Sequence, residues 1–485
     1  MHEHSLTELS AAIKNKTLSS VEVTQHFLNR IHKHENLNAF LEVHEQQALK
    51  QAKWCDNNPE SSKDKPLFGV PIAHKDIFCT IDGHTTCASK VLDKFQANYD
   101  ATVVKKCAHA GMINLGKLNM DEFAMGSTNE NSAYGPVANP WNHENCPGGS
   151  SGGSASAVSA RLAPIATGSD TGGSIRQPAS FTGITGIKPT YGRISRYGMI
   201  AFASSLDQAG PMTTSVSDAA LMLNIMCGYD HNDTTTAQIA VPDFTKNLNN
   251  DIKGLTIGIP EEFFGDGLQE DCKLAVEKAI KTYQELGAII KPIHLPNLSF
   301  AIPTYYLLAP IEAASNLARY DGIHYGYRHK DAESLESLYQ LSREYGFGKE
   351  VKRRILIGTF ASSTEYSAAY YKQALIAKKI ITNDYKKAFT EVDAILTPTT
   401  TSTAFKLNNK DQSPSSLYLS DIYTVSVNLA SLPALSIPVG FDHKNLPIGM
   451  QLISNRFNEQ TILQLGHAYQ RATQWHTMYP ELYKG

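Results

Sequence analysis

Two glycine- and serine-rich stretches stand near the centre of the sequence: Pro147-Gly148-Gly149-Ser150-Ser151-Gly152-Gly153-Ser154 and Gly168-Ser169-Asp170-Thr171-Gly172-Gly173-Ser174-Ile175-Arg176-Gln177-Pro178. Between them the sequence predicts a helix of small residues, 151–162, and a strand, 164–167. Glycine lets a backbone approach a ligand closely, and successive amides that point the same way form an anion-binding nest. A nest of this kind suits the oxyanion of a tetrahedral intermediate.

The serine that ends the second nest is therefore a candidate nucleophile. Its hydroxyl would lie beside the amide donors, as the attacking atom of an acyl transfer must. Ser174 is predicted to be this nucleophile, with Thr171, Gly172 and Gly173 as candidate oxyanion-hole donors. A phosphate-binding loop is the other use of such glycines, but the sequence has no Gly-x-x-x-x-Gly-Lys-[Ser/Thr] motif.

A serine nucleophile needs a neighbour that takes its proton. The chain has 17 histidines, but none lies within the glycine-rich stretches. A lysine can act instead if burial lowers its pKa toward neutrality. Lys75 follows the apolar run Val70 to Ala73 at the end of an expected strand, so it is predicted to be the base, with Ser150 as the proton bridge.

Composition excludes several other classes of function. The formal net charge is −3, with 44 basic and 47 acidic residues, so no basic surface for nucleic acid or membrane is expected. Seven scattered cysteines without a CxxC pair predict reduced thiols, and no His/Cys cluster has metal-ligand spacing. No signal pattern and no apolar run of roughly 18 residues is present. We expect a cytoplasmic protein without a metal.

Short apolar runs alternate with helical segments along most of the chain. This pattern predicts one α/β domain, with a central mixed, mostly parallel sheet covered by helices on both faces. N-terminal helices are expected at about 1–60, where Ser5-x-x-Glu8 and Ser19-x-x-Glu22 are capping boxes. A core is expected at about 67–215, and helical elaborations at about 300–390.

The stretch from Gly149 to Pro178 resembles the signature of the amidase signature family, and similarity of this kind covers nearly the whole chain. The resemblance implies that Lys75, Ser150 and Ser174 form a catalytic triad with a cis peptide bond before Ser150. The family often has a β-branched aliphatic residue before the lysine and Asn after the aspartate, where this chain has His74 and Ile77. This departure lies beside the base and leaves the triad intact.

Four further segments are similar to one branch of the family, the A subunits of glutamyl-tRNA(Gln) amidotransferases. That resemblance implies glutamine hydrolysis, with ammonia passed on to convert Glu-tRNA(Gln) to Gln-tRNA(Gln). It also implies B and C subunits as partners in a heterotrimer. No cofactor is expected in this chain, and ATP and Mg²⁺ would be used by the assembled complex. The four segments are 117–127, 191–208, 314–322 and 346–354.

Glutamine recognition needs an arginine for the α-carboxylate and a carboxylate for the α-ammonium. By resemblance Arg354 and Asp421 fill these roles, and Tyr305 lines the pocket. The alternative for Arg354 is an arginine on the surface of a helix, and the alternative for Asp421 is a helix N-cap. Asp170 and Arg176 are expected to brace the nucleophile loop. A stand-alone amidase for another small amide and a non-catalytic scaffold protein are the competing functions.

Overall fold

The structure is a computed structural model of residues 1–485, and it describes all of them except 266, 368, 410–417, 419 and 485. Within the described chain, eleven strands form one sheet in the order β1-β3-β2-β4-β6-β5-β10-β11-β9-β7-β8. The strands are β1 (Phe40–Val43), β2 (Pro71–Lys75), β3 (Ile113–Leu118), β4 (Ala166–Asp170), β5 (Thr185–Lys188), β6 (Gln208–Thr213), β7 (Thr256–Pro260), β8 (Ile289–Ile293), β9 (Ala394–Pro398), β10 (Ala434–Phe441) and β11 (Pro447–Ser454).

The α/β class and the mixed sheet are confirmed, but the prediction that the sheet is mostly parallel is wrong. Among the described strands, six of the ten neighbouring pairs are antiparallel, and four are parallel. The connection between β10 and β11 shows why: it consists of residues 442–446 alone. A parallel crossover needs about a dozen residues or more, so a loop this short requires an antiparallel neighbour.

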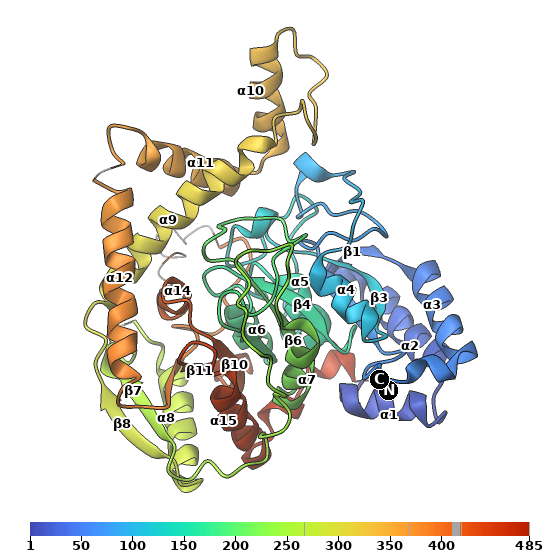
Figure 1. Ribbon diagram of the computed structural model, residues 1–485, viewed down its shortest axis with the longest axis vertical. Coiled ribbons are helices and arrows are strands. Elements are labelled where there is room, and N and C mark those ends of the chain that lie inside the picture. The colour runs from blue at the N-terminus through green and yellow to red at the C-terminus, as the bar shows by residue number, and fades with distance from the viewer. Residues whose placement is uncertain (266, 368, 410–417, 419, 485) are drawn as a thin grey trace.

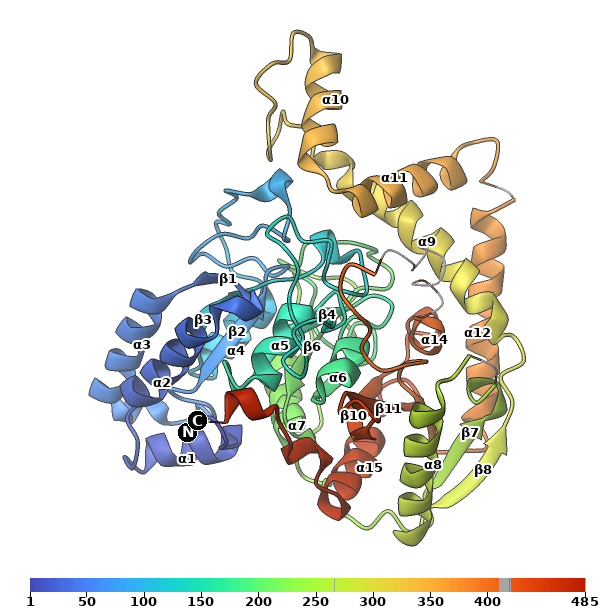
Figure 2. The ribbon, with the colours of Figure 1, turned by 180° about the vertical axis from the view of Figure 1, so that it is seen from behind.

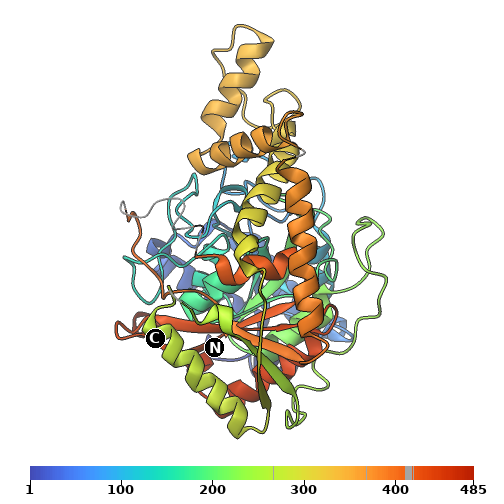
Figure 3. The ribbon, with the colours of Figure 1, turned by 90° about the vertical axis from the view of Figure 1, so that its left-hand side faces the viewer.

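Helices cover both faces of the sheet, as Figure 3 shows from the side. Helix α15 contacts α7 and α8, and these three helices also pack against strands: α7 against β6, α8 against β10 and α15 against β11. Helix α5 packs against β4, and α6 packs against β5 and β10. The helices are α1 (Leu6–Lys14), α2 (Ser20–Lys33), α3 (Glu45–Asn57), α4 (Thr102–His109), α5 (Gly152–Ser159), α6 (Arg176–Thr182), α7 (Val216–Met226), α8 (Glu270–Glu285), α9 (Ala301–Asn316), α10 (Leu335–Gly346), α11 (Lys349–Ser362), α12 (Tyr371–Ala388), α14 (Ile422–Leu429) and α15 (Glu459–Ala472).

Both N-terminal capping boxes are confirmed. Ser5 caps α1 and Ser19 caps α2, and in each case the glutamate three residues later reaches back to the cap amide. These contacts satisfy amides that would otherwise be unpaired at the start of a helix. Figure 2 shows α1 and the N-terminus at one edge of the fold, and Tyr479, near the other end of the chain, donates to Glu3.

A helical arm formed by α9, α10, α11 and α12 rises from the sheet, and α10 projects away from the body of the molecule (Figure 1). Helix α9 packs against α11, α12 and α14, so the base of the arm is joined to the rest of the fold. In the described part of the chain, no helix is both long and apolar enough to cross a membrane.

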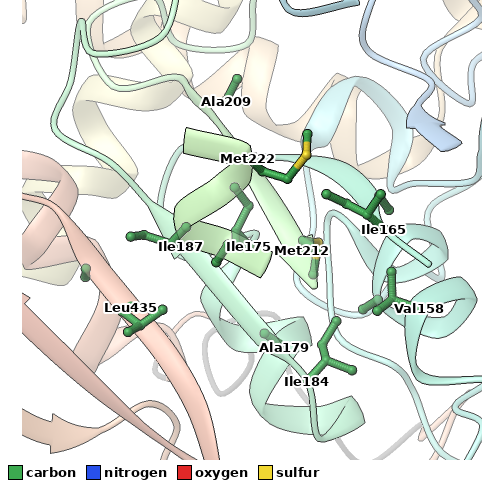
Figure 4. Packing of buried hydrophobic residues seen from close by; sticks show 14 of the residues in the cluster. Val158, Ile165, Ile175, Ala179, Ile184, Ile187, Ala209, Met212, Met222 and Leu435 are labelled. Atoms are coloured by element: carbon green, nitrogen blue, oxygen red, sulfur yellow. The ribbon is translucent and has the colours of Figure 1, made fainter. Parts of the chain in front are cut away.

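The core continues directly beneath the second glycine-rich stretch. Ile175, the neighbour of Ser174, is fully buried and lies close to Ala179, Ile187 and Met212 (Figure 4). Burial of aliphatic side chains of this size stabilises each by roughly 1.5–3 kcal/mol. The loop that carries Ser174, the predicted nucleophile, is therefore attached to a rigid base.

Candidate active site

Lys75 ends β2 and is completely buried. Its Nζ lies 2.8 Å from Oγ of Ser150, 2.8 Å from Oγ of Ser151 and 2.9 Å from Oγ of Ser169. Burial lowers the pKa of Lys75 to about 7, although the negative charges of Asp121 and Asp170 raise it in part. A large fraction of this amine is therefore uncharged near neutral pH, and three hydroxyl groups hold it in place.

The two glycine-rich stretches are in contact at their serines. The amide of Ser151 donates to the carbonyl of Ser174 at 3.3 Å, and the peptide bond between Gly149 and Ser150 is cis, as the family resemblance implies. Ser174 lies on the loop between β4 and α6 and lines a cavity, whereas Ser150 is fully buried behind it. The hydroxyl of Ser174 has no hydrogen bond within the described part of the chain, so it is free to face a substrate.

Three of the four amides in the loop 171–174 are available to an oxyanion. The Gly173 amide is not, because it donates to Oδ1 of Asp170 at 2.8 Å. The prediction of Gly173 as a donor is therefore corrected. The amides of Thr171, Gly172 and Ser174 have no partner among the described residues. An aspartate that accepts from the amide three residues later is a common local turn, which the sequence could have indicated.

Asp170 and Arg176 form the expected brace under this loop. The two side chains are fully buried, with Arg176 Nε 3.0 Å from Asp170 Oδ2. Burial alone would raise the pKa of Asp170, but the Arg176 charge and its hydrogen bonds outweigh that and hold the pKa well below its usual range. Arg176 also donates to Asn428 at 2.6 Å and to Gln451 at 3.0 Å, which joins the loop to α14 and β11.

The three residues predicted to bind substrate come from distant parts of the sequence and meet at one cavity. Tyr305 lies on α9, Arg354 on α11, and Asp421 immediately before α14. Together with Ser174 they line a cavity of about 10 Å³, which is room for one water molecule. Its other lining residues are Ala124, Gly126, Ser127, Gly149, Gly172, Gly173 and Tyr306.

Asp421 occupies the N-cap position of α14, but its side chain does not cap the helix. Its carboxylate instead accepts from Ser127 Oγ at 3.0 Å and from the Tyr306 hydroxyl at 2.8 Å. Burial raises the pKa of Asp421 to about 6. Asp421 is therefore the N-cap residue by its backbone position, but its carboxylate lines the cavity and does not cap the helix.

Arg354 is buried and is not a surface arginine. Its Nε donates to Glu350 Oε1 at 2.8 Å. The aromatic rings of Phe202, Tyr306 and Tyr418 lie 5.5, 5.3 and 5.7 Å from the guanidinium carbon. A guanidinium held this way retains donors for a carboxylate ligand.

Sequence reasoning missed several residues that touch the site. Ser151 and Ser169 contact the lysine, Ser127 and Tyr306 contact Asp421, and Glu350 contacts Arg354. Lone serines and tyrosines have no local pattern that reveals such contacts. His74, which stands before Lys75 where the family often has a β-branched aliphatic residue, forms a hydrogen bond of 3.2 Å between its Nδ1 and Thr167 Oγ1. Burial lowers the pKa of His74 to about 3, so its ring is uncharged.

A buried lysine in contact with a serine, next to a glycine-rich nucleophile loop, defines an amide-cleaving class of enzyme. Residues 22–463 match the amidase family, and the chain belongs to that family. It is 54% identical over 484 residues to the A subunit of the glutamyl-tRNA(Gln) amidotransferase of Nitrosococcus oceani, covering 100% of both chains. It is 55% identical over 482 residues to the protein of the same name from Thioalkalivibrio sulfidiphilus, covering 99% of both.

Solved structures show the same similarity. The crystal structure of the glutamyl-tRNA(Gln) amidotransferase A subunit from Thermotoga maritima aligns with a TM-score of 0.82 at 38% identity, covering 99% of this chain and 97% of that one. The peptide amidase of Stenotrophomonas maltophilia aligns with a TM-score of 0.81 at 29% identity, covering 97% of each chain. Enzymes named for different amides therefore share this fold, and the cavity must decide the substrate.

Proposed function

We propose that this chain is the glutamine-hydrolysing A subunit of a glutamyl-tRNA(Gln) amidotransferase. The observation that carries the proposal is the contact of Lys75 with Ser150, 2.8 Å from Nζ to Oγ, behind a cavity lined by Ser174, Arg354 and Asp421. The full-length similarity to proteins of that name supports the choice of glutamine among amides.

In the first half-reaction Ser174 attacks the side-chain amide carbon of glutamine. Neutral Lys75 takes a proton from Ser150, and Ser150 takes the proton of Ser174 as the new C–O bond forms. The amides of Thr171, Gly172 and Ser174 are placed to stabilise the oxyanion, because they have no partner among the described residues.

Collapse of the tetrahedral intermediate releases ammonia. Lys75 returns its proton through Ser150 to the departing nitrogen, the C–N bond breaks, and a γ-glutamyl ester remains on Ser174. Water then attacks the ester, with the same pair of groups accepting and returning a proton. The products are ammonia and glutamate, and Ser174 regains its hydroxyl.

Substrate orientation follows from the charges around the cavity. Arg354 binds the α-carboxylate of glutamine, Asp421 binds the α-ammonium, and Tyr305 contacts the side chain against Gly172. The Tyr305 ring lies close to Gly172, since a Cβ added to Gly172 would be only 2.5 Å from that ring. A cavity of about 10 Å³ cannot hold glutamine, so substrate enters only when lining side chains such as Tyr306 move apart.

The remaining steps belong to an assembly. In this proposal a B subunit uses ATP and Mg²⁺ to activate Glu-tRNA(Gln), ammonia from this chain completes Gln-tRNA(Gln), and a small C subunit holds the two together. In this proposal ATP and Mg²⁺ are bound outside the present chain. Its formal charge of −3 agrees with a tRNA contact made mainly by partners.

The test is ammonia release from glutamine by the chain co-purified with its B and C partners, comparing native protein with Ser174→Ala. Release that disappears in the variant supports both the nucleophile and the substrate. If the native complex releases no ammonia, even with ATP and Glu-tRNA(Gln) present, the glutaminase proposal fails. A stand-alone amidase acting on another small amide would then be preferred.

A further inference from the structure

Glu350 contacts Arg354 but does not line the cavity that Arg354 shares with Ser174. It is the second residue of α11, and Arg354 is one helical turn later. Oε1 of Glu350 accepts from Arg354 Nε at 2.8 Å and from the Tyr418 hydroxyl at 3.0 Å. Its other oxygen accepts from Arg353, whose side chain is 45% exposed.

This contact uses only one edge of the guanidinium. The group is planar and has five donors, so an acceptor at Nε leaves the edge formed by the two terminal nitrogens. Among the described residues, Glu350 is the only hydrogen-bond partner of Arg354, and Arg354 lines the same cavity as Ser174 and Asp421. The rings of Phe202 and Tyr306 limit tilting of the guanidinium plane.

We propose that Glu350 is a specificity-determining positioning residue, which orients Arg354 so that its free edge receives the α-carboxylate of the amide substrate. The proposal rests on the proposed function, because glutamine supplies that carboxylate. Glu350 also compensates the charge of Arg354 while the site is empty, so the arginine stays buried and in place between turnovers. Glu350 thereby favours amides that carry a carboxylate without touching the substrate.

The experiment uses the complex of this chain with its partners and two amides. One is glutamine, and the other is 4-aminobutanamide, which is glutamine without its α-carboxylate. In E350Q the shape of residue 350 is kept and its charge is lost. We expect the KM for glutamine to rise about tenfold with kcat changed by less than about twofold, as the loss of one charge-assisted contact predicts. The kcat/KM for 4-aminobutanamide should stay the same.

Two comparisons separate positioning from a structural role. R353Q removes the exposed partner of the same carboxylate and should leave both substrates unaffected. In an Arg354→Gln background, E350Q should cause no further rise in KM, because the two residues act as one unit. If E350Q melts at a much lower temperature, Y418F provides the same test with a smaller rise in KM for glutamine.

An unchanged KM for glutamine in E350Q would overturn the inference, and so would equal losses with both amides. Failure of the proposed function is seen separately, because the native complex would then release no ammonia from glutamine before any variant is compared.

Discussion

Lys75 Nζ lies 2.8 Å from Ser150 Oγ at a position where neither residue has measurable exposure. Water cannot supply or remove protons at that contact directly, so the lysine exchanges its proton through hydroxyl groups. Ser150 is one of the three hydroxyl groups that contact Lys75 Nζ, and the proposed mechanism gives it the transfer to Ser174. In the proposed mechanism the protonation state of this one buried amine therefore controls the chemistry.

Activity should rise with pH across neutrality. Lys75 acts as a base only when uncharged, and burial places its pKa at about 7, so kcat should be low at pH 6 and approach a plateau above pH 8. Asp421, with a pKa of about 6, should add a loss of kcat/KM below pH 6, because its carboxylate must be charged to bind the α-ammonium. A pH profile of glutamine hydrolysis measures both. Activity that falls between pH 6 and 8 would contradict a lysine base.

Ser150→Ala should interrupt the proton relay and leave binding intact. We expect kcat to fall by about 10²–10⁴-fold, the usual contribution of general acid–base catalysis, with KM nearly unchanged. Ser151→Ala is the matched control, because Ser151 also contacts Lys75 at 2.8 Å but its hydroxyl donates to the carbonyl of Ser169. Equal losses in the two variants would show that Ser150 has no special part in proton transfer.

Gly172→Ala should impair catalysis by crowding Tyr305. A Cβ at residue 172 would lie 2.5 Å from the Tyr305 ring and 2.6 Å from its hydroxyl oxygen, so the ring must move from the cavity. We expect a loss of at least about tenfold in kcat/KM for glutamine. Gly265→Ala, where a Cβ meets nothing within 4 Å, serves as the control and should behave like native protein.

Arg176→Leu should destabilise the fold as well as the site. The substitution leaves Asp170 buried and charged without its partner, a change that typically costs about 3–5 kcal/mol. Urea denaturation at pH 7 measures it, with Lys291→Leu, in an exposed ion pair, as a control expected to change little. Because the folded-state pKa of Asp170 is lowered, this stability is present above the carboxyl's unfolded pKa and is lost as the pH falls through the folded value. Equal stability of native protein and R176L would refute the brace.

The sequence was sufficient to predict the local parts of the site. Gly149 to Ser151 and Gly172 to Ser174 have a glycine–serine pattern whose backbone consequences are local, and Lys75 follows an apolar strand. Arg354 and Asp421 required resemblance, because nothing in their neighbouring residues shows that α11 and α14 approach Ser174. Glu350 and Tyr306 were missed for the same reason, since their partners are fixed by tertiary packing.

The errors also have local physical causes. The sheet direction was mispredicted because apolar runs such as 434–439 do not encode strand direction, whereas the short loop at 442–446 does. A glycine in a nest suggests a free amide, but the Gly173 amide donates to the Asp170 side chain. Asp421 is not among these errors: the resemblance implies a substrate-binding role for it, and its carboxylate accepts from Ser127 and Tyr306 instead of capping α14.

The most direct test of the account is to identify the residue that carries the covalent intermediate. The complex is incubated with glutamine, quenched in acid within a turnover, and digested for mass spectrometry. We predict a γ-glutamyl ester on the peptide that contains Ser174, and its absence in Ser174→Ala. Ammonia release accompanied by an adduct on another residue, or undiminished release from Ser174→Ala, would contradict the assignment of Ser174 as nucleophile.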